Sequence, residues 1–474
     1  MLHSWTVSNF KSIREKTELT LGPLTFLCGE NNSGKSSFIQ SLLLISQTLS
    51  NEIQNNHLIL NGNLVNLGQF KVIISNDSDS DHILIQFSCA LPDNANILVN
   101  RMVTNSKEIS DTKIYYERSQ EQLWSQEQLQ YISGEIIISS ELEPELEPEP
   151  TSFYDDSPKI SPNILSTKLS RSFKDSDIDK AHFLFRQPKP SPNKAVQERN
   201  ILEYEKSLIF FRCFFTSYLK YLGPFREAPK LVYQSNASGN PYDIGVKGEY
   251  TCSIFELHKN KLIRYIPPKH FLDNEINLNT VENPLEFAVS EWLQYLGVAN
   301  SVESHDLGEY GVELKVRTLD SSGPHSLTNV GVGVSQVLPV LVMCLLAPEE
   351  SLLIFEQPEL RLNPKVQSLL GDFFLSIVLT AKQCIIETHS EYLIDRVRFR
   401  ISASATESKL SNLTKIYFVE KLSNGSSFKN VVINEYGAVK NWPRGFFEES
   451  QILAERILRA ATIKRKSKDK DKNW

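Results

Sequence analysis

The octapeptide GENNSGKS, residues 29–36, is the feature that most constrains how this chain of 474 residues can fold. It fits the pattern G-x-x-x-x-G-K-[ST] in full. The apolar stretch LTFLC precedes it, and Phe38, Leu42, Ile45 and Leu49 repeat after it with helical spacing. A strand, a glycine-rich loop and a helix in this order predict a phosphate-binding loop within an α/β fold. The alternative, a glycine-rich turn that happens to hold a lysine, is disfavoured by this context.

The residue types in the loop suit the binding of phosphate. Gly29 and Gly34 allow backbone conformations that are closed to bulkier residues, so that successive N–H groups can face a β-phosphate. Lys35 supplies a positive charge for the β- and γ-phosphates, and the Ser36 hydroxyl is a ligand for Mg²⁺. The helix that begins at Ser36 adds the positive end of its dipole. The predicted nucleotide-binding residues are Gly29, Asn31, Asn32, Ser33, Gly34, Lys35, Ser36 and Ser37.

A nucleotide site of this kind also needs an acidic residue that holds Mg²⁺ at the end of a buried strand. The segment SLLIFEQPE supplies one, because residues 352–355 predict a strand and Glu356 stands at its carboxyl end. Pro358 then favours the start of a helix. A surface glutamate after a core strand is the alternative, and the phosphate loop upstream disfavours it. Ser36 and Glu356 are therefore the predicted metal ligands.

Two further segments extend the predicted site. In CIIETHSEYLI a buried strand ends near His389, which can hydrogen-bond a γ-phosphate oxygen and respond to its loss, although a lone histidine is more often structural. In NVGVGVSQ, Gly331, Gly333, Ser335 and Gln336 stand at the start of an apolar helix, which predicts a second anion site. One phosphate loop suffices for the chain's own nucleotide. The surplus site is explained if it caps the γ-phosphate bound to a second subunit.

The middle of the chain has a different composition. Residues 101–200 are polar and contain the tandem repeat ELEPELEPEP, whose prolines exclude a helix, so disorder is expected there. A tolerated surface insertion is favoured over an acidic segment that attracts a basic partner. The expected divisions are 1–100, the first part of the nucleotide-binding lobe with the phosphate loop; 101–200, the polar insertion; 201–300, a helical and aromatic segment; 301–445, the second part of the lobe; and 446–474, a helix and charged tail.

The overall composition leaves the partner open. A net charge of -7 argues against a uniform nucleic-acid-binding surface, but a local basic face is compatible with it. Six cysteines without a C-x-x-C pair indicate reduced thiols in the core. We find no apolar leader segment and no run of about eighteen apolar residues, so we expect a soluble, cytoplasmic protein without a membrane partner.

The order of these motifs resembles the ABC-type ATPase heads of the SMC, RecF and OLD group. The chain is more closely similar to a bacterial subset known as AAA-family ATPases with a C-terminal domain of unknown function, in which YLGPFREAPK, GVGVSQVLPVL, FEQPEL and NWPRGFFEE recur in this order. The resemblance covers most of the chain except residues 101–200 and the tail. It implies a bilobal α/β head with a mixed sheet, ATP and Mg²⁺ as cofactors, and a homodimer that sandwiches two ATP molecules between the phosphate loop and the segment around Gly333 and Ser335.

Three departures from the group bear on activity. Gln357 stands where ABC heads usually keep the glutamate that polarises the attacking water, and an amide cannot accept its proton. We therefore expect a slow ATPase, with Glu359 as a candidate substitute. Arg361 and Asn363 replace two histidines that are common after the acidic strand, so no role of those histidines applies here. Residues 101–200 lack the apolar heptads of an SMC coiled-coil arm.

Two functions of different classes fit these expectations. The first is a slow ATPase head that dimerises around ATP and acts on double-stranded DNA, in repair or in bacterial defence against phage. The second is an ATP-gated scaffold, with little hydrolysis of its own, that regulates a partner nuclease or toxin encoded by an adjacent gene. A P-loop kinase of small metabolites fits poorly, since no lid with paired arginines is evident. The predicted catalytic residues are Glu356, Gln357, Glu359 and His389.

Overall fold

The computed structural model describes the greater part of the chain on both sides of a long gap. The described residues are 1–50, 58–75, 82–91, 130–139, 182–185, 210–234, 240–273, 276–318, 323–404, 409–440, 443 and 452–462. Most of the expected polar insertion at 101–200 lies outside them, and so does the prediction of disorder for those residues.

Six strands form the central sheet. They are β3 (Leu24–Gly29), β7 (Leu219–Leu222), β13 (Leu352–Glu356), β14 (Gln383–Glu387), β15 (Thr414–Leu422) and β16 (Gly425–Val431). Their order is β16-β15-β3-β14-β13-β7, and all neighbours are parallel except β16, which pairs antiparallel with β15. Every residue of β13 and β14 is buried, as expected for parallel strands covered on both faces. The predicted α/β class with a mixed sheet flanked by helices is confirmed.

A second sheet of five antiparallel strands adjoins the first helix. It consists of β1 (Leu2–Ser8), β2 (Thr17–Thr20), β4 (His82–Leu91), β5 (Gln130–Ser139) and β6 (His182–Phe185), in the order β2-β1-β4-β5-β6. Strands β5 and β6 fall inside residues 101–200, so part of that range extends this sheet. Ile136 and Ile138 of β5 are fully buried, which shows that the range contributes to the core.

Helix α1 (Lys35–Leu49) connects the phosphate loop to this second sheet. Its Phe38 and Leu42 share one hydrophobic cluster with Trp5 of β1 and Ile385 of β14. The indole N–H of Trp5 donates a hydrogen bond to the Ser41 hydroxyl at 2.9 Å, so the one polar atom of this large side chain is satisfied. The apolar residues whose spacing predicts α1 thus pack against residues of both sheets. This packing holds the phosphate loop, which leads into α1, in place.

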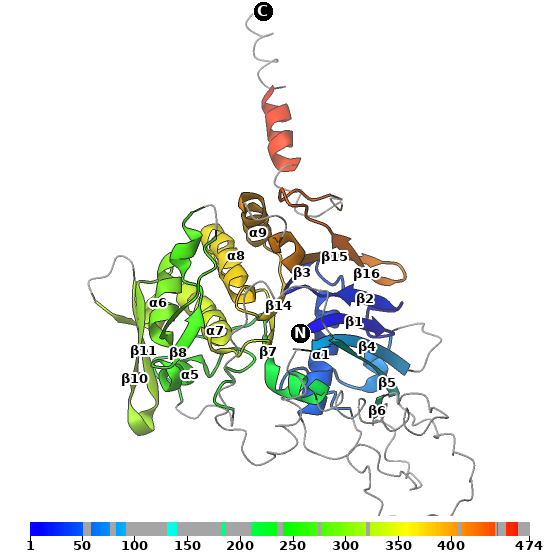
Figure 1. Cartoon of the computed structure of the whole chain (residues 1–474), viewed down its shortest axis with the longest axis horizontal. Helices are drawn as coiled ribbons and strands as arrows, with labels where there is room; N and C mark the ends of the chain where they lie inside the picture. The colour runs from blue at the N-terminus through cyan, green and yellow to red at the C-terminus, as the bar shows by residue number, and fades with distance from the viewer. Residues whose placement is uncertain are drawn as a thin grey trace, which may run out of the picture.

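The remaining elements are helices and short strands, most of which form a lobe beside the central sheet. They are α2 (Phe70–Ile73), η3 (Phe214–Tyr218), α5 (Thr251–His258), β8 (Leu262–Tyr265), η4 (Pro268–Phe271), β9 (Val281–Pro284), α6 (Leu285–Tyr295), β10 (Ser301–Asp306), η5 (Gly308–Tyr310), β11 (Val312–Arg317), β12 (His325–Ser326), η6 (Leu327–Asn329), α7 (Val332–Leu346), α8 (Pro364–Val378), α9 (Glu391–Ala403) and α10 (Lys409–Leu413). Helix α2 and the π-helix η3 lie instead near α1 in the hydrophobic cluster of the second sheet. In Figure 1 the group from α5 to β11 lies on one side, the antiparallel sheet lies on the other, and β7, β14 and β3 run between them.

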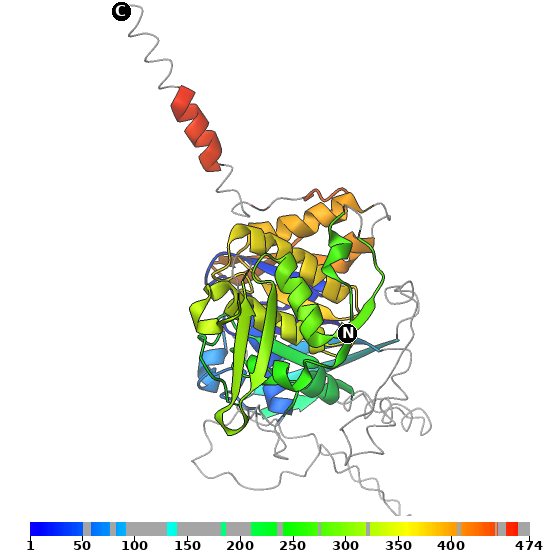
Figure 2. The same cartoon turned by 90° about the vertical axis from the view of Figure 1, so that its left-hand side faces the viewer.

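A further helix spans residues 452–462 near the end of the chain. It stands apart from the rest of the molecule in both Figure 1 and Figure 2. Its Leu453, Ile457 and Leu458 are more than half exposed. Within the described residues, no helix has the length and apolar character needed to cross a membrane.

A buried ionic cluster fastens α9 to α8 and α6. Asp372 is fully buried and accepts hydrogen bonds from Arg396 Nη2 at 2.7 Å, Arg400 Nε at 2.8 Å and the Tyr295 hydroxyl at 2.6 Å. Arg400 is 1% exposed, and its Nη1 also donates to the carbonyl oxygen of Asp273 at 2.6 Å. One buried carboxylate therefore forms ion pairs with two guanidinium groups, of which Arg400 is fully buried.

We predict that Asp372→Ala lowers the free energy of unfolding by about 3–5 kcal/mol, because it leaves Arg400 buried without a counter-charge. Asp395→Ala is the matched control, since the Asp395–Arg398 pair is solvent-exposed and is worth at most about 1 kcal/mol. Urea unfolding of both variants measures the difference. Equal losses in the two variants would show that the Asp372 cluster does not hold these helices together.

Candidate nucleotide-binding site

The candidate site lies along the edge of the central sheet that is formed by the carboxyl ends of four parallel strands. The register pairs Glu356 of β13 directly with Glu387 of β14, and pairs Glu387 with Leu27 of β3. Phe355 of β13 pairs with Leu222, the last residue of β7. The chain segments that follow β3, β14, β13 and β7 therefore leave the sheet side by side, and ligands of open α/β sheets bind at such an edge.

The phosphate loop follows β3 and is closely confined by its neighbours. Gly34 has φ 111°, and a Cβ atom there would lie 2.0 Å from the hydroxyl oxygen of Ser426. Gly29 has φ 137°, and its Cβ would lie 2.2 Å from the carbonyl oxygen of Val419. These two positions require glycine both for backbone conformation and for space. Asn32 also has a positive φ, of 59°, at the exposed tip of the loop.

Lys35 and Ser33 are the buried polar side chains of the loop. Lys35 is 3% exposed, and its ammonium group donates to the carbonyl oxygens of Gly29 at 3.1 Å and Glu30 at 2.6 Å. Burial lowers the pKa of Lys35, and the nearby Glu387 carboxylate opposes that shift. Within the described chain, the Ser33 hydroxyl has no hydrogen-bond partner. A buried cation held only by neutral carbonyls, beside an unpaired hydroxyl, fits the binding of phosphate. Asn31 is exposed and Ser37 is half-buried.

Two carboxylates face the loop from the neighbouring strands. The Ser36 hydroxyl donates to Glu387 Oε2 at 3.0 Å, and the Tyr221 hydroxyl donates to Glu356 Oε1 at 2.8 Å. Burial, followed by repulsion from Glu356, raises the pKa of Glu387 to about 7, and burial also raises that of Glu356. A hydroxyl and one or two carboxylates are the protein ligands that Mg²⁺ takes beside nucleotide phosphates. The predicted metal ligands Ser36 and Glu356 thus come together, and Glu387 joins them.

Glu387 is a residue that the sequence reasoning missed, although its signal is the one that identifies Glu356. Both glutamates end an entirely buried strand. The parallel register makes them neighbours, so the second carboxylate is as well placed for a cation as the first.

Gln357, Glu359 and His389 lie in the turns that follow β13 and β14. Gln357 has φ 45°, and its backbone N–H donates to the carbonyl oxygen of Glu387 at 2.8 Å. Glu359 is 7% exposed; its Oε1 accepts from the backbone N–H of His389 at 2.8 Å, and its Oε2 has no partner among the described residues. Burial raises the pKa of Glu359. The His389 side chain is exposed at the rim, where partial desolvation and Lys35 lower its pKa.

The glycine–serine segment lies at the start of α7, on the lobe side of the molecule. Gly331 is exposed and Gly333 is half-buried, so backbone is accessible at this helix N-terminus. Ser335 and Gln336 are buried, and the Ser335 hydroxyl donates to the carbonyl oxygen of Val332 at 2.8 Å. Of the four predicted residues, the two glycines are therefore the ones open to a second molecule.

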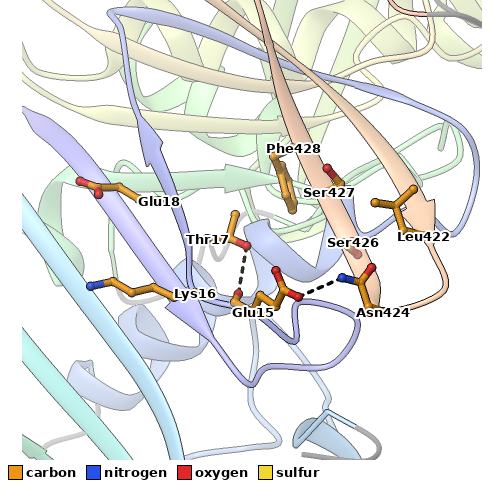
Figure 3. Close-up of a pocket in the computed structure, with 9 residues that line it drawn as sticks. All are labelled: Glu15, Lys16, Thr17, Glu18, Leu422, Asn424, Ser426, Ser427 and Phe428. Carbon is orange, nitrogen blue, oxygen red and sulfur yellow. Dashed lines mark hydrogen bonds between the residues drawn. The ribbon is translucent and has the colours of Figure 1, made fainter.

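A polar cleft of about 300 Å³ adjoins the phosphate loop on the side of β16. Figure 3 shows that its walls come from the start of β2 and from the hairpin of β15 and β16. The lining residues are Glu15, Lys16, Thr17, Glu18, Leu422, Asn424, Ser426, Ser427 and Phe428. Ser426 belongs both to this wall and to the contact with Gly34, so this residue lies between the cleft and the loop. Because the hairpin is distant in sequence, no local pattern indicates this neighbour.

Comparisons with known families identify the two halves of the chain. Residues 1–207 match the family described as "AAA ATPase domain", and residues 227–395 match "AAA domain, putative AbiEii toxin, Type IV TA system". Both of these parts of the chain therefore match AAA domains. Residues 411–457 match a family described as "Protein of unknown function (DUF3696)". None of the curated proteins matches the chain.

Several solved structures are similar to this chain. An SMC head bound to the C-winged helix domain of ScpA has 10% identity and a TM-score of 0.45, covering 91% of this chain and 98% of that one. The SMC head domain from Thermotoga maritima has 9% identity and a TM-score of 0.38, with 91% and 98% covered. An SMC head with an extended coiled coil, bound to the C-terminal domain of ScpA from Pyrococcus furiosus, has 9% identity and a TM-score of 0.43, with 96% and 99% covered.

We predict that Gly34→Ala disturbs the phosphate loop more than its backbone angle alone requires. The new methyl group meets Ser426 and Ser12, so the free energy of unfolding falls by about 1–3 kcal/mol and nucleotide binding is lost. Gly68→Ala is the control, because Gly68 also has a positive φ but no atom lies within 4 Å of its added Cβ. Thermal unfolding and nucleotide titration compare the two. Adding Ser426→Gly to Gly34→Ala restores part of the loss, and no recovery would show that the hairpin does not confine the loop.

Proposed function

We propose that this AAA ATPase binds Mg·ATP at the edge formed by β3, β14 and β13 and hydrolyses it slowly. The observation that carries the proposal is the convergence of Lys35, Ser36, Glu356 and Glu387 from three separate strands. Each of these residues is charged or polar and at least half-buried, which is costly unless a ligand completes the site.

The residues around the phosphates have distinct proposed roles. Lys35 exchanges the carbonyl oxygens of Gly29 and Glu30 for phosphate oxygens, and the loop N–H groups bind the β-phosphate. Ser36 and Glu356 hold Mg²⁺, with Glu387 beside them. When bound, Mg²⁺ offsets negative charge that accumulates on the phosphates. The cleft at Ser426 accommodates the part of the nucleotide beyond the loop.

The water that attacks the γ-phosphate is proposed to lie between Gln357 and Glu359. The Gln357 amide can orient water but cannot take its proton. Glu359 can, because its Oε2 is buried without a partner in the described chain while Oε1 is held by the His389 N–H. A pKa raised by burial also brings this carboxylate closer to neutral pH, where a general base is most effective. ATP hydrolysis therefore proceeds with Glu359 as the base. It is slow because position 357 carries an amide and not a carboxylate.

A second copy of the chain is the proposed partner across the nucleotide. The exposed Gly331 and half-buried Gly333 start a helix of 15 residues, whose N–H groups and dipole suit a γ-phosphate bound to another subunit. Gln336 and the Ser335 side chain face inward, so contact is proposed through backbone or after a side-chain turn. ATP binding then favours the closed homodimer, and loss of the γ-phosphate favours opening.

The proposed output of this cycle is an action on double-stranded DNA in repair or anti-phage defence. The alternative is an ATP-gated scaffold that controls a partner nuclease or toxin from an adjacent gene. The family matched by residues 227–395 carries the description of a putative toxin of a toxin–antitoxin system, which supports a role in such a module. We place both alternatives in the cytoplasm.

Phosphate release from Mg·ATP tests the catalytic proposal, with dimer content recorded in the same samples. Lys35→Ala abolishes turnover by removing the phosphate-binding cation. Glu359→Gln lowers turnover by about 10²–10⁴-fold if this carboxylate is the base, whereas Gln357→Glu raises it. Glu309→Gln, at an exposed glutamate of η5, is the matched control and leaves turnover unchanged. Unaltered turnover in Glu359→Gln would remove Glu359 from the mechanism.

Binding to duplex DNA separates the two outputs. With a non-hydrolysable ATP analogue, we expect the wild-type chain to bind DNA at about 50 mM salt and to lose affinity as salt rises, because phosphate contacts release counterions. Lys35→Ala should not show the ATP-dependent part. Fluorescence anisotropy measures both. If no binding occurs at low salt, the scaffold alternative replaces the DNA-acting one.

A further inference from the structure

Arg226 lies at the same carboxyl-terminal edge of the sheet, after the fourth strand, β7. It follows β7 by four residues, in the segment GPFR that leaves the sheet beside Glu356. Two backbone hydrogen bonds fix this segment, from Gly223 N–H to Val246 O and from Glu227 N–H to Lys247 O, both 2.8 Å. The preceding Phe225 is 71% exposed, so the chain turns outward at Phe225 and back inward at Arg226.

The guanidinium group of Arg226 is buried and incomplete. Its Nε, Nη1 and Nη2 atoms are all inaccessible to solvent, and none has a hydrogen-bond partner among the described residues. Glu356, Glu359 and Tyr221 are its electrostatic neighbours, but no ion pair joins it to either carboxylate. Burial lowers the pKa of Arg226 to about 10, which still leaves it cationic at neutral pH.

An arginine in this state needs an anion. It carries five N–H donors in a planar fork and does not give up its proton, so burial without partners is a large unfavourable term. Phosphate oxygens match that fork in charge and spacing. The unpaired Oε2 of Glu359 belongs to the same cluster, so hydrogen-bond donors and an acceptor without partners are electrostatic neighbours here.

The position of β7 indicates which phosphate is concerned. Neighbouring strands are spaced by about 4.8 Å, and β7 is three strands from β3, with Glu387 and Glu356 between them. The phosphate loop therefore approaches a bound nucleotide from one end of this edge, and Arg226 approaches from the other. With the β-phosphate in the loop and the nucleoside on the side of the cleft lined by Ser426, the terminal phosphate is the phosphate that faces β7.

We propose that Arg226 binds the terminal phosphate of the nucleotide and makes the site selective for a triphosphate over a diphosphate. This rests on the proposed function, because it assumes that a nucleotide occupies the phosphate loop. Tyr221, on the same strand, holds Glu356 through its hydroxyl. Strand β7 thus supplies both a terminal-phosphate ligand and a positioning residue for the acidic strand.

Equilibrium titration with ADP and with the imido analogue of ATP tests the proposal. Arg226→Met weakens binding of the triphosphate by about 10- to 100-fold, since it removes charge-assisted hydrogen bonds, and changes ADP binding by less than about threefold. Arg226→Lys keeps the charge without the fork and gives an intermediate loss. Arg264→Met is the matched control, because Arg264 is exposed and donates a hydrogen bond to the Thr280 hydroxyl at the surface.

The outcomes separate this inference from the function beneath it. If the wild type binds both nucleotides, Lys35→Ala binds neither, and Arg226→Met weakens both equally or not at all, Arg226 is not a terminal-phosphate ligand. If the wild type itself binds no nucleotide, the proposed function fails first. Melting temperature without nucleotide is a second readout: Arg226→Met should match or exceed the wild type, because it removes an unpaired buried cation. A large fall instead would assign Arg226 a structural role.

Discussion

Unbalanced buried charge at one edge of the parallel sheet is the constraint on which the proposed chemistry depends. Five buried charged groups lie there: Glu356, Glu359, Glu387, Lys35 and Arg226. Few of them form hydrogen bonds or ion pairs with one another. Burial raises the pKa of all three acids and lowers that of both cations, so each group is held away from its preferred state. Protein interiors tolerate such an arrangement where a ligand supplies the missing charge and hydrogen bonds. A metal ion and a polyphosphate together supply both.

The parallel register is what collects these groups from distant parts of the chain. Strands β7, β13, β14 and β3 are separated in sequence by the lobe and by residues beyond the described part, yet each ends at the same level of the sheet. The buried Asp372 cluster and the packing of α1 between two sheets hold the flanking helices, so the strand ends cannot shift independently. Rigid support of this kind lets costly polar groups remain in place without their ligand.

The sequence predicts the local parts of this site and not the tertiary ones. The loop and Glu356 are recognisable because a strand, its terminal residue and the next helix are contiguous. Glu387 carries the same signal, at the end of a buried strand, and lies two residues before His389, whose side chain is exposed. Arg226 and Ser426 are identified only by what they face, since nothing in their own segments reports a buried guanidinium or a contact with the loop. The sequence did not predict strands β5 and β6, because the average composition of the hundred residues 101–200 is polar and obscures two short apolar segments.

The turn after β13 suggests how hydrolysis and conformational change are linked in the proposed cycle. Gln357 is tied through its N–H to the carbonyl of Glu387, and Glu359 is tied through Oε1 to the N–H of His389. Both residues nearest the proposed water are therefore positioned by the end of β14 and the residues that follow it, and not by their own strand alone. The same segment carries the His389 ring, whose pKa is lowered partly by Lys35 and which is thus an electrostatic neighbour of the phosphate-binding cation. Any shift of this segment when the γ-phosphate departs would move the proposed base with it. A base at Glu359 would therefore make turnover depend on the state of this neighbouring segment.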